Sequence, residues 1–482
     1  MSEAAHVDRS LVRGIAWTGS VKWAVQVLSW SSTLVIVRHV SPADYGIVGS
    51  ATLYLGLLTL VADFGIGAAV IRLRELPESL LEQLHAAATV LGGLGTLVGL
   101  GIAIPLGWFF DSPPLPAVIA ALSTTLLVAG LRTVPLAVMQ RDLRFRAIAL
   151  AEAGQAVFGA AVTVSLAVAG WGYWALAAGS LVQAAAYTLI VLRSQPLRLR
   201  YPRLGELTAP LTISKHVLLG QVSWWIYSNA DFVVVGRVLG QAAMGLYLLA
   251  WQFASLPVEK ITNVVTRVTP GVFSALQHDR QMLRARFLAI SEGIAMLTLP
   301  ASWGLAVVAE DFVLSAFGTS WHGAIQPLQL LSLYVALRSV VTLLPQVLIA
   351  VGESRVVART SILFVTVMPL SFIIGSQWGT TGIATAWVIA FPMLNIPLYR
   401  HVFSHLELNA REYLKALRPP IVGTAAMTAA LVAVRPVLSS IESPLARLAT
   451  SMALGMLCYA VVAVWPQRAR IRSILSYLKG GG

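Results

Sequence analysis

The sequence is poor in charged residues and almost lacks cysteine. Asp, Glu, Lys and Arg make up only 11% of its 482 residues, whereas a soluble domain carries about 25%. So few charges could not cover the water-facing surface of a chain this long. The single cysteine, Cys458, has no partner for a disulfide within the chain. The composition therefore excludes soluble enzymes, secreted domains and disordered regulators.

The sequence also lacks the short motifs of several kinds of chemistry. It contains no Walker A sequence, no GxSxG nucleophile elbow, no HExxH zinc motif and no cysteine cluster. Its net charge of +13 is spread along the chain rather than gathered in one basic patch. We therefore expect a protein that is not an enzyme, that needs no cofactor or metal, and that binds no nucleic acid.

Hydrophobic residues, in contrast, make up 57% of the chain. A bilayer core is crossed by about 20 helical residues, and by this measure the sequence divides into fourteen apolar segments. We predict an all-α integral membrane protein with about 14 transmembrane helices. The predicted spans are residues 12–39, 43–69, 83–110, 114–140, 147–169, 172–193, 213–238, 241–266, 287–309, 324–351, 357–376, 380–400, 418–438 and 443–466.

The basic residues alternate with these spans. With the N-terminus on the cytoplasmic side, 27 of the 34 Lys and Arg residues fall in or beside cytoplasmic segments, as the positive-inside rule requires. Both termini are therefore predicted to be cytoplasmic. The four exceptions on the outer side are Arg38, Arg237, Arg435 and Arg447.

Aromatic residues cluster at the predicted outer ends of the spans. Amphipathic rings favour the boundary between lipid and water, so we predict that these residues anchor the helices there. They are Trp108, Phe109, Phe110, Trp171, Tyr173, Trp174, Trp321 and Trp378.

Short sequences from the first six spans recur in the next six. Residues 35–46 align without gaps to residues 234–245, at an offset of 199 that pairs Gly46 with Gly245. Because six is an even number, both copies enter the membrane from the same side, which is typical of transporters built from parallel repeats. Two further matches follow in the same order, residues 131–134 with 337–340, and Trp171 and Gly172 with Trp378 and Gly379.

The repeat predicts two pseudo-symmetric lobes of six helices around a substrate site that lies between them. Two C-terminal helices lie outside the repeat. The predicted divisions are an N-terminal lobe (residues 1–193), a cytoplasmic linker (194–212), a C-terminal lobe (213–400), and the last two helices with a cytoplasmic tail (401–482).

Some polar and charged residues fall inside the predicted spans, where they usually face a cavity. Arg132 and Arg338 are repeat mates, and arginine stays protonated at any relevant pH. Lys22 and Gln26 share one helical face, and the repeat pairs Lys22 with Gln221. We predict that these five residues line a substrate cavity suited to phosphate or carboxylate groups. Alternatively, each arginine pairs with an acidic neighbour or with the C-terminus of a helix for structural reasons.

Two aspartates also lie within the spans, Asp63 and Asp231. A carboxylate partly removed from water can exchange a proton or hold a sodium ion. We therefore consider both as candidates for coupling transport to an ion gradient.

Several diffuse motifs along nearly the whole chain resemble one family of membrane proteins. They are residues 37–46, Asp63–Gly67, Gln140–Arg146, Gly170–Leu176 and Leu348–Glu353. The chain resembles the polysaccharide transporter family, in particular its Wzx-like oligosaccharide flippases. This family belongs to the multidrug/oligosaccharidyl-lipid/polysaccharide exporter superfamily.

The resemblance implies a multi-pass protein of the bacterial cytoplasmic (inner) membrane that works by alternating access. Its expected cargo is an oligosaccharide repeat unit linked to undecaprenyl diphosphate, moved across the membrane for exopolysaccharide or lipopolysaccharide biosynthesis. Its expected partners are this lipid-linked oligosaccharide, membrane lipid and the polysaccharide polymerase machinery.

Three alternatives stay open. A multidrug or cation antiporter of the same superfamily would need an acidic cavity, and the arginines argue against it. A lipid II flippase would share the span count and the cationic cavity. A membrane glycosyltransferase or polymerase would need an acidic metal-binding motif or a large outer loop, and the sequence has neither.

Overall fold

The predicted helical fold is confirmed by the computed structural model. Every regular element in the described part of the chain is a helix. Lys22, Gln221 and most of the predicted linker lie outside the described residues. The structure describes residues 23–63, 65–73, 77–201, 225–226 and 228–468.

The helices agree with the predicted spans. Eleven stretches of the described chain are helical, long and apolar enough to cross a membrane. Two of them, Ser228–Ala275 and Ser354–His405, each hold residues of two predicted spans. The first predicted span enters the described residues only at position 23, and residues 23–39 are helical. The fourteen predicted spans are thus all matched by helical residues.

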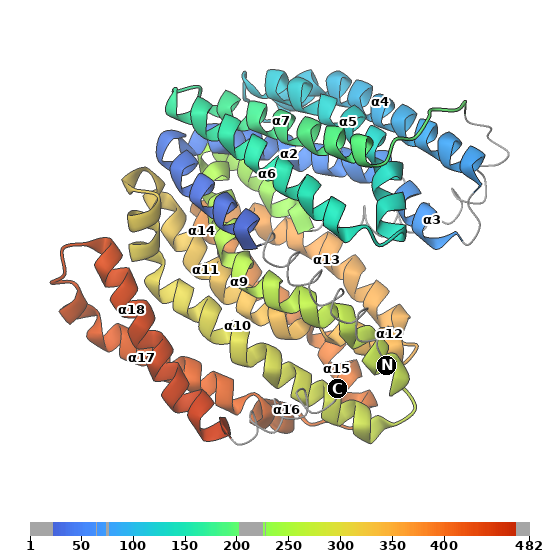
Figure 1. Cartoon of the computed structure of the whole chain (residues 1–482). Coiled ribbons are helices and arrows are strands. Elements are labelled where there is room, and N and C mark those ends of the chain that lie inside the picture. Colours follow the sequence, from blue (N-terminus) through green and yellow to red (C-terminus); the bar gives the residue numbers. More distant parts are fainter. Residues whose placement is uncertain (1–22, 64, 74–76, 202–224, 227, 469–482) are drawn as a thin grey trace, which may run out of the picture. The chain divides into compact units, whose positions relative to one another are not determined.

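The chain divides into two compact units, Met1–Gly245 and Leu246–Gly482, and the boundary lies inside a helix. The division of the sequence into two lobes, a linker and a C-terminal part stays a prediction. The helical segments of the first unit are residues 23–39, α2 (Pro42–Asp63), α3 (Ile66–Arg72), α4 (Glu78–Phe109), α5 (Leu115–Arg141), α6 (Phe145–Val168), α7 (Tyr173–Ser194), residues 228–234, the π-helix η1 (Val235–Leu239) and the first turns of α9 (Gly240–Ala275) (Figure 1).

The second unit contains the rest of α9 and the remaining helices. Its membrane-spanning and connecting helices are α10 (Arg280–Ala316), the 3-10 helix η2 (Thr319–Ala324), α11 (Ile325–Val341), α12 (Leu344–Ala350), α13 (Ser354–Gly375), η3 (Ser376–Trp378), α14 (Gly379–Leu394), α15 (Ile396–His405), α16 (Ala410–Ala416), α17 (Arg418–Leu438), α18 (Pro444–Tyr459), η4 (Ala460–Val464) and η5 (Trp465–Gln467).

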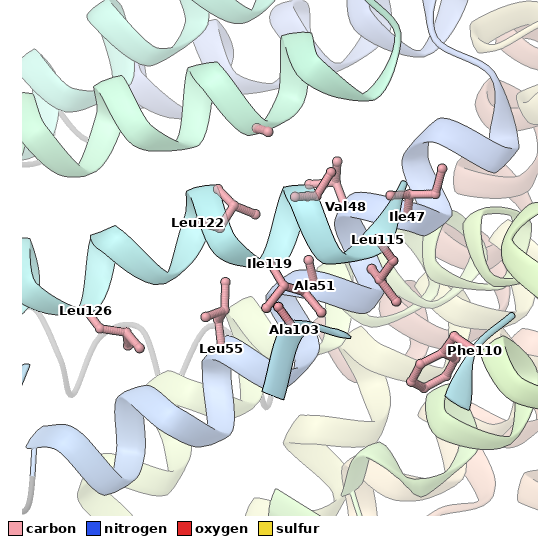
Figure 2. Packing of buried hydrophobic residues seen from close by; sticks show 12 residues of the cluster. Ile47, Val48, Ala51, Leu55, Ala103, Phe110, Leu115, Ile119, Leu122 and Leu126 are labelled. Carbon is pink, nitrogen blue, oxygen red and sulfur yellow. The ribbon is translucent and has the colours of Figure 1, made fainter. Parts of the chain in front are cut away.

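Apolar side chains of α2, α4 and α5 interlock in the core of the first unit. Figure 2 shows Leu55 of α2, Ala103 of α4, and Ile119 and Leu122 of α5 packed together. All four are buried. Lipid tails are as apolar as leucine, so this contact is stabilised by close packing rather than by escape from water.

Small residues bring α4 and α5 close together. A Cβ atom on Gly130 of α5 would lie 2.5 Å from the carbonyl oxygen of Ala88, and one on Gly92 of α4 would lie 2.5 Å from that of Leu126. Neither position has room for a side chain. Glycine at such contacts lets helix backbones approach within a membrane, which fixes α5 and the residues it carries.

Two predicted spans are broken in ways that hydropathy does not reveal. The predicted span 43–69 ends as a regular helix at Asp63, and α3 starts after Gly65, whose φ of 70° suits glycine. The predicted span 324–351 divides between α11 and α12, and Pro345 lies in the first turn of α12. Each break exposes backbone groups that a continuous helix would bond internally.

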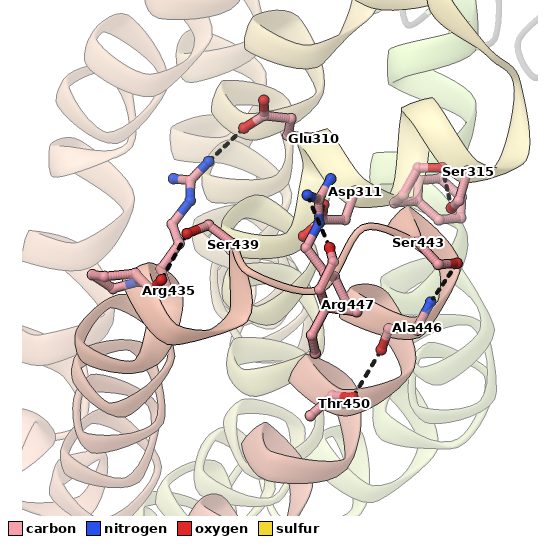
Figure 3. A network of polar contacts seen from close by, with 12 residues as sticks. Glu310, Asp311, Ser315, Arg435, Ser439, Ser443, Ala446, Arg447 and Thr450 are labelled. Atoms are coloured by element: carbon pink, nitrogen blue, oxygen red, sulfur yellow. Dashed lines mark hydrogen bonds and ion pairs between the residues drawn. The ribbon is translucent and has the colours of Figure 1, made fainter.

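Two ion pairs join the C-terminal hairpin α17–α18 to the end of α10. Arg435 of α17 pairs with Glu310, and Nε of Arg447 on α18 lies 2.8 Å from Oδ1 of Asp311 (Figure 3). Both arginines are among the four that depart from the positive-inside pattern. Because a carboxylate neutralises each of them, their place on the predicted outer side costs less than an isolated charge would.

Two of the aromatic residues predicted at the membrane boundary are buried instead. Trp321 has no exposed surface, and Phe110 is 3% exposed. Trp321 lies in η2, which packs against α10 and α11. Trp108 and Trp378 are 78% and 67% exposed, as an anchor at the boundary requires. Burial in the protein therefore replaces anchoring at two positions.

A short helix, α16, joins the twelfth and thirteenth predicted spans. Nη2 of Arg284 lies 2.6 Å from Oε2 of Glu412, and the ring of Tyr413 stacks on Phe287 with 5.8 Å between centroids. Burial raises the pKa of the Tyr413 hydroxyl, so it stays neutral. Both contacts hold α16 against the start of α10.

Candidate substrate site

Arg132 lies in the membrane-spanning part of α5, beside α7. The central carbon of its guanidinium is 5.1 Å from the centroid of the Tyr187 ring. Its Nη1 atom donates to Oγ1 of Thr188 at 3.4 Å, and that hydroxyl donates to the carbonyl of Val128 at 3.1 Å. Two consecutive residues of α7 thus hold the arginine in place.

Arg132 has no carboxylate partner among the residues that the structure describes, because none of the ion pairs in this part of the chain includes it. A guanidinium carries five N–H groups, and a single bond of the side chain, to Thr188, is made within this part of the chain. Stacking on Tyr187 contributes about 0.5–2 kcal/mol and leaves the positive charge unchanged. The group can therefore bind an anion.

Arg338 lies in the last turn of α11 in the second unit. It is partly buried, and within the described chain its guanidinium makes no hydrogen bond or ion pair. The next residue, Ser339, is 1% exposed and its hydroxyl lies 2.8 Å from that of Thr298 on α10. This buried contact fixes the backbone on which Arg338 is carried.

The two arginines occupy corresponding places in the order of helices. Arg132 is on α5, which packs against α4, and Arg338 is on α11, which packs against α10. Each helix pair consists of the third and fourth spans of one predicted repeat. The order of elements thus agrees with the repeat found in the sequence.

The other predicted site residues are placed in part. Gln26 is partly buried on the helix of residues 23–39, and Asp231 is fully buried just before the π-helix η1. Asp63 is the last residue of α2, at the helix break. Lys22 and Gln221 lie outside the described residues. Whether all these residues line one cavity stays a prediction.

Sequence reasoning missed the residues that hold Arg132. Tyr187 and Thr188 form an adjacent pair of hydroxyl-bearing residues inside a mainly apolar span, and this pair was the available signal. The ring therefore lies against the guanidinium of Arg132 rather than against lipid alone.

The helical fold is that of a membrane transporter, and comparison with known families agrees. Residues 35–326 match the family described as "Polysaccharide biosynthesis protein". This match covers more than half of the chain. The chain belongs to this family, which confirms the resemblance seen in the sequence.

Two relatives are similar to this chain beyond the region that matches the family. The teichuronic acid biosynthesis protein TuaB of Bacillus subtilis (strain 168) is 24% identical over 486 aligned residues, covering 96% of this chain and 97% of TuaB. The lipopolysaccharide biosynthesis protein WzxC of Escherichia coli (strain K12) is 25% identical, with 78% of each chain covered.

Among solved structures, the fold is similar to that of the lipid II flippase MurJ in an inward closed conformation. The TM-score is 0.71 at 15% identity, and the match covers 95% of this chain and all of MurJ. At this identity the likeness establishes the fold. The protein is thus a multi-pass membrane protein of transporter fold.

Proposed function

We propose that this protein is a flippase that moves a lipid-linked oligosaccharide repeat unit across the cytoplasmic membrane for exopolysaccharide or lipopolysaccharide biosynthesis. The observation that carries the proposal is Arg132, a membrane-embedded guanidinium with no carboxylate partner in the described chain. The family to which the chain belongs is described by its role in polysaccharide biosynthesis, and the resemblance noted in the sequence implies a cargo carried on undecaprenyl diphosphate.

The chemistry of a diphosphate suits two fixed arginines. Guanidinium groups bind phosphate oxygens through charge-assisted hydrogen bonds, each contributing about 1.5–3 kcal/mol. Arg132 and Arg338 contribute such groups from corresponding helices of the two repeats, with Lys22, Gln26 and Gln221 as further polar lining. A polar oligosaccharide cannot cross lipid unaided, so these side chains replace the water that its diphosphate loses.

Transport then follows from alternating access. The two repeats rock about the site and expose it to each side in turn. Asp63 and Asp231 are candidates for coupling this cycle to a proton or sodium gradient, because protonation of an embedded carboxylate removes its charge. The protein itself makes and breaks no covalent bond in this scheme, so we propose that it is not an enzyme.

The expected setting is the bacterial inner membrane with both termini cytoplasmic. There the repeat unit is delivered to the outer leaflet, where polymerase machinery uses it. The outer arginines Arg435 and Arg447 are compatible with this orientation because each is paired with an acid.

Other functions have less support. A multidrug antiporter binds cationic cargo, and the positive charges of Arg132 and Arg338 would disfavour such binding. A lipid II flippase shares the fold and a diphosphate cargo, and only the sugar distinguishes it. A glycosyltransferase or polymerase would need an acidic metal-binding motif or a large outer loop, and the sequence contains neither.

The double variant Arg132→Ala/Arg338→Ala tests the proposal. In proteoliposomes that contain a fluorescent prenyl-diphosphate oligosaccharide, we expect its translocation rate to fall at least tenfold, because charge-assisted bonds to the diphosphate are lost. Polysaccharide export by intact cells should stop as well. The measurement is the fraction of fluorescent lipid that reaches the opposite leaflet over time.

Two controls make the result specific. Arg198→Ala removes an exposed arginine of the linker and should leave translocation unchanged. Arg132→Lys/Arg338→Lys keeps both charges and should retain part of the activity. Parental translocation by the double alanine variant, at equal amounts of inserted protein, would refute the role of these arginines.

A further inference from the structure

Two glycines bring the backbones of α2 and α9 into direct contact. A Cβ atom on Gly46 of α2 would lie 1.8 Å from the carbonyl oxygen of Gln241, and one on Gly245 of α9 would lie 1.8 Å from the carbonyl oxygen of Pro42. Such a side chain would overlap the neighbouring helix. Both helices therefore cross at a point where only glycine fits.

The contact is reciprocal in the numbering of the repeat. The offset of 199 pairs Gly46 with Gly245, and it also pairs Pro42 with Gln241. Gly46 contacts Gln241, which is the repeat equivalent of Pro42. Gly245, which is the repeat equivalent of Gly46, contacts Pro42. A contact of this kind, in which residue i meets j and j meets i, is the signature of a two-fold axis. The contact around the two glycines is thus locally two-fold symmetric.

The crossing lies near the start of both helices. Gly46 and Gly245 are each in the second turn of their helix, on the side predicted to face outward. In a carrier built from parallel repeats, the substrate path follows the axis between them. A backbone contact at the outer ends of two repeat-related helices would close such a path.

The forces at the crossing suit a contact that opens. The hydrogen on each glycine Cα points toward a carbonyl oxygen, and such Cα–H···O contacts are weak. One ordinary hydrogen bond adds to them, from the hydroxyl of Ser50 to Oε1 of Gln241 at 2.9 Å. No ion pair among the described residues ties the crossing together.

We propose that the crossing of Gly46 with Gly245 is the outer gate of this carrier, and that it separates to release cargo. This inference rests on the proposed transport function. Bulk at either glycine holds the helices apart and favours the state that is open to the outside. Because the contact is symmetric, the two glycines have equal effects.

Thiol labelling tests the gate without any cargo. In a Cys458→Ala chain, which then contains no cysteine, Ser50→Cys places one thiol at the crossing. Ser50 is fully buried, so a membrane-impermeant maleimide added to intact cells should label it slowly. Gly46→Leu or Gly245→Leu should raise the labelling rate about tenfold or more, because overpacking separates the helices.

Matched variants make the outcome decisive. Gly101→Leu adds the same bulk where a Cβ would meet nothing within 4 Å, and it should leave labelling at the parental rate. Gly46→Ala and Gly245→Ala should raise labelling by similar factors, and the double alanine variant by less than their product, because one separation makes room for both. If a leucine variant is not inserted into the membrane, the labelling rates of Gly46→Ala and Gly245→Ala still test the gate.

Three results would overturn the gate: labelling in the glycine variants equal to that of Gly101→Leu, an effect of one glycine only, or full multiplication in the double variant. The labelling needs no substrate, so it is independent of the cargo. Increased labelling together with no translocation of the lipid-linked probe by the parent would support the gate and refute the proposed cargo.

Discussion

At the scale of single residues, Arg132 is held by an aromatic face rather than by an acid. The ring of Tyr187 lies under its guanidinium and Thr188 takes one hydrogen bond. A carboxylate partner would fix the side chain equally well but would compete with an anionic cargo. Stacking thus orients the arginine and leaves its charge available.

Two substitutions of Tyr187 distinguish the contribution of its aromatic ring from that of its hydroxyl. Tyr187→Phe keeps the aromatic face and should retain near-parental translocation of the lipid-linked probe. Tyr187→Ala removes a stacking contribution of about 0.5–2 kcal/mol and should lower the rate about two- to thirtyfold at limiting probe. Rates are measured in proteoliposomes with equal amounts of protein. Equal loss in both variants would assign the effect to the hydroxyl instead.

The sequence was sufficient to single out Arg132 and Arg338, because a charge inside an apolar span is visible without a structure. It could not predict Tyr187 as a neighbour, since that contact depends on α5 and α7 being adjacent. Trp321 illustrates the same limit: its position suggested the membrane boundary, while packing of η2 on α10 and α11 buries it.

At the scale of helices, hydropathy predicted where spans lie and missed where they break or continue. Helix α10 begins at Arg280, before its apolar segment, because residues 280–286 are mostly good helix formers. Helix α9 continues past its apolar segment to Ala275 although this extension contains Pro270 and Gly271, which disfavour helix. The break at Gly65 depends on a left-handed backbone conformation, which an average over an apolar window cannot detect.

The pair Arg447–Asp311 should matter more to the attachment of α17 and α18 than the pair Arg435–Glu310. The side chains of the first pair are 24% and 25% exposed, against 62% and 44% for the second, and exposed pairs contribute about 0–1 kcal/mol. We expect Asp311→Arg to lower the melting temperature of the purified protein clearly, and Glu310→Ala to lower it little.

A charge swap supplies the control for this prediction. Asp311→Arg/Arg447→Asp rebuilds the pair with reversed charges and should recover most of the lost melting temperature. A swap that is no more stable than Asp311→Arg alone would show that the interaction of the pair does not account for the loss.

At the scale of the whole molecule, the repeat is what connects the sequence to a mechanism. The matching residues fall on corresponding helices in both halves of the chain, α5 with α11 for the arginines and α2 with α9 for the glycines. Sequence comparison of the two halves revealed these pairs. The contact between Gly46 and Gly245 itself required coordinates, because equivalence in a repeat does not imply proximity.

The even number of spans predicts that both ends of the chain lie on the same side of the membrane, and the distribution of Lys and Arg predicts that this side is cytoplasmic. A fluorescent protein that folds only in the cytoplasm should be bright when fused to either terminus. Alkaline phosphatase, which is active only outside, should be active when inserted in the loop of residues 439–443. Phosphatase activity at the C-terminus would contradict the predicted topology.

The pairing of Arg435 and Arg447 with α10 also bears on how the chain is made. With this topology, the hairpin α17–α18 must carry both arginines through the bilayer, against the usual retention of such residues in the cytoplasm. By then α10 has already left the ribosome and presents Glu310 and Asp311 as acceptors. With this topology, carboxylates of the earlier helix α10 are present when the two arginines arrive. The order of synthesis then contributes to the orientation of the last two helices.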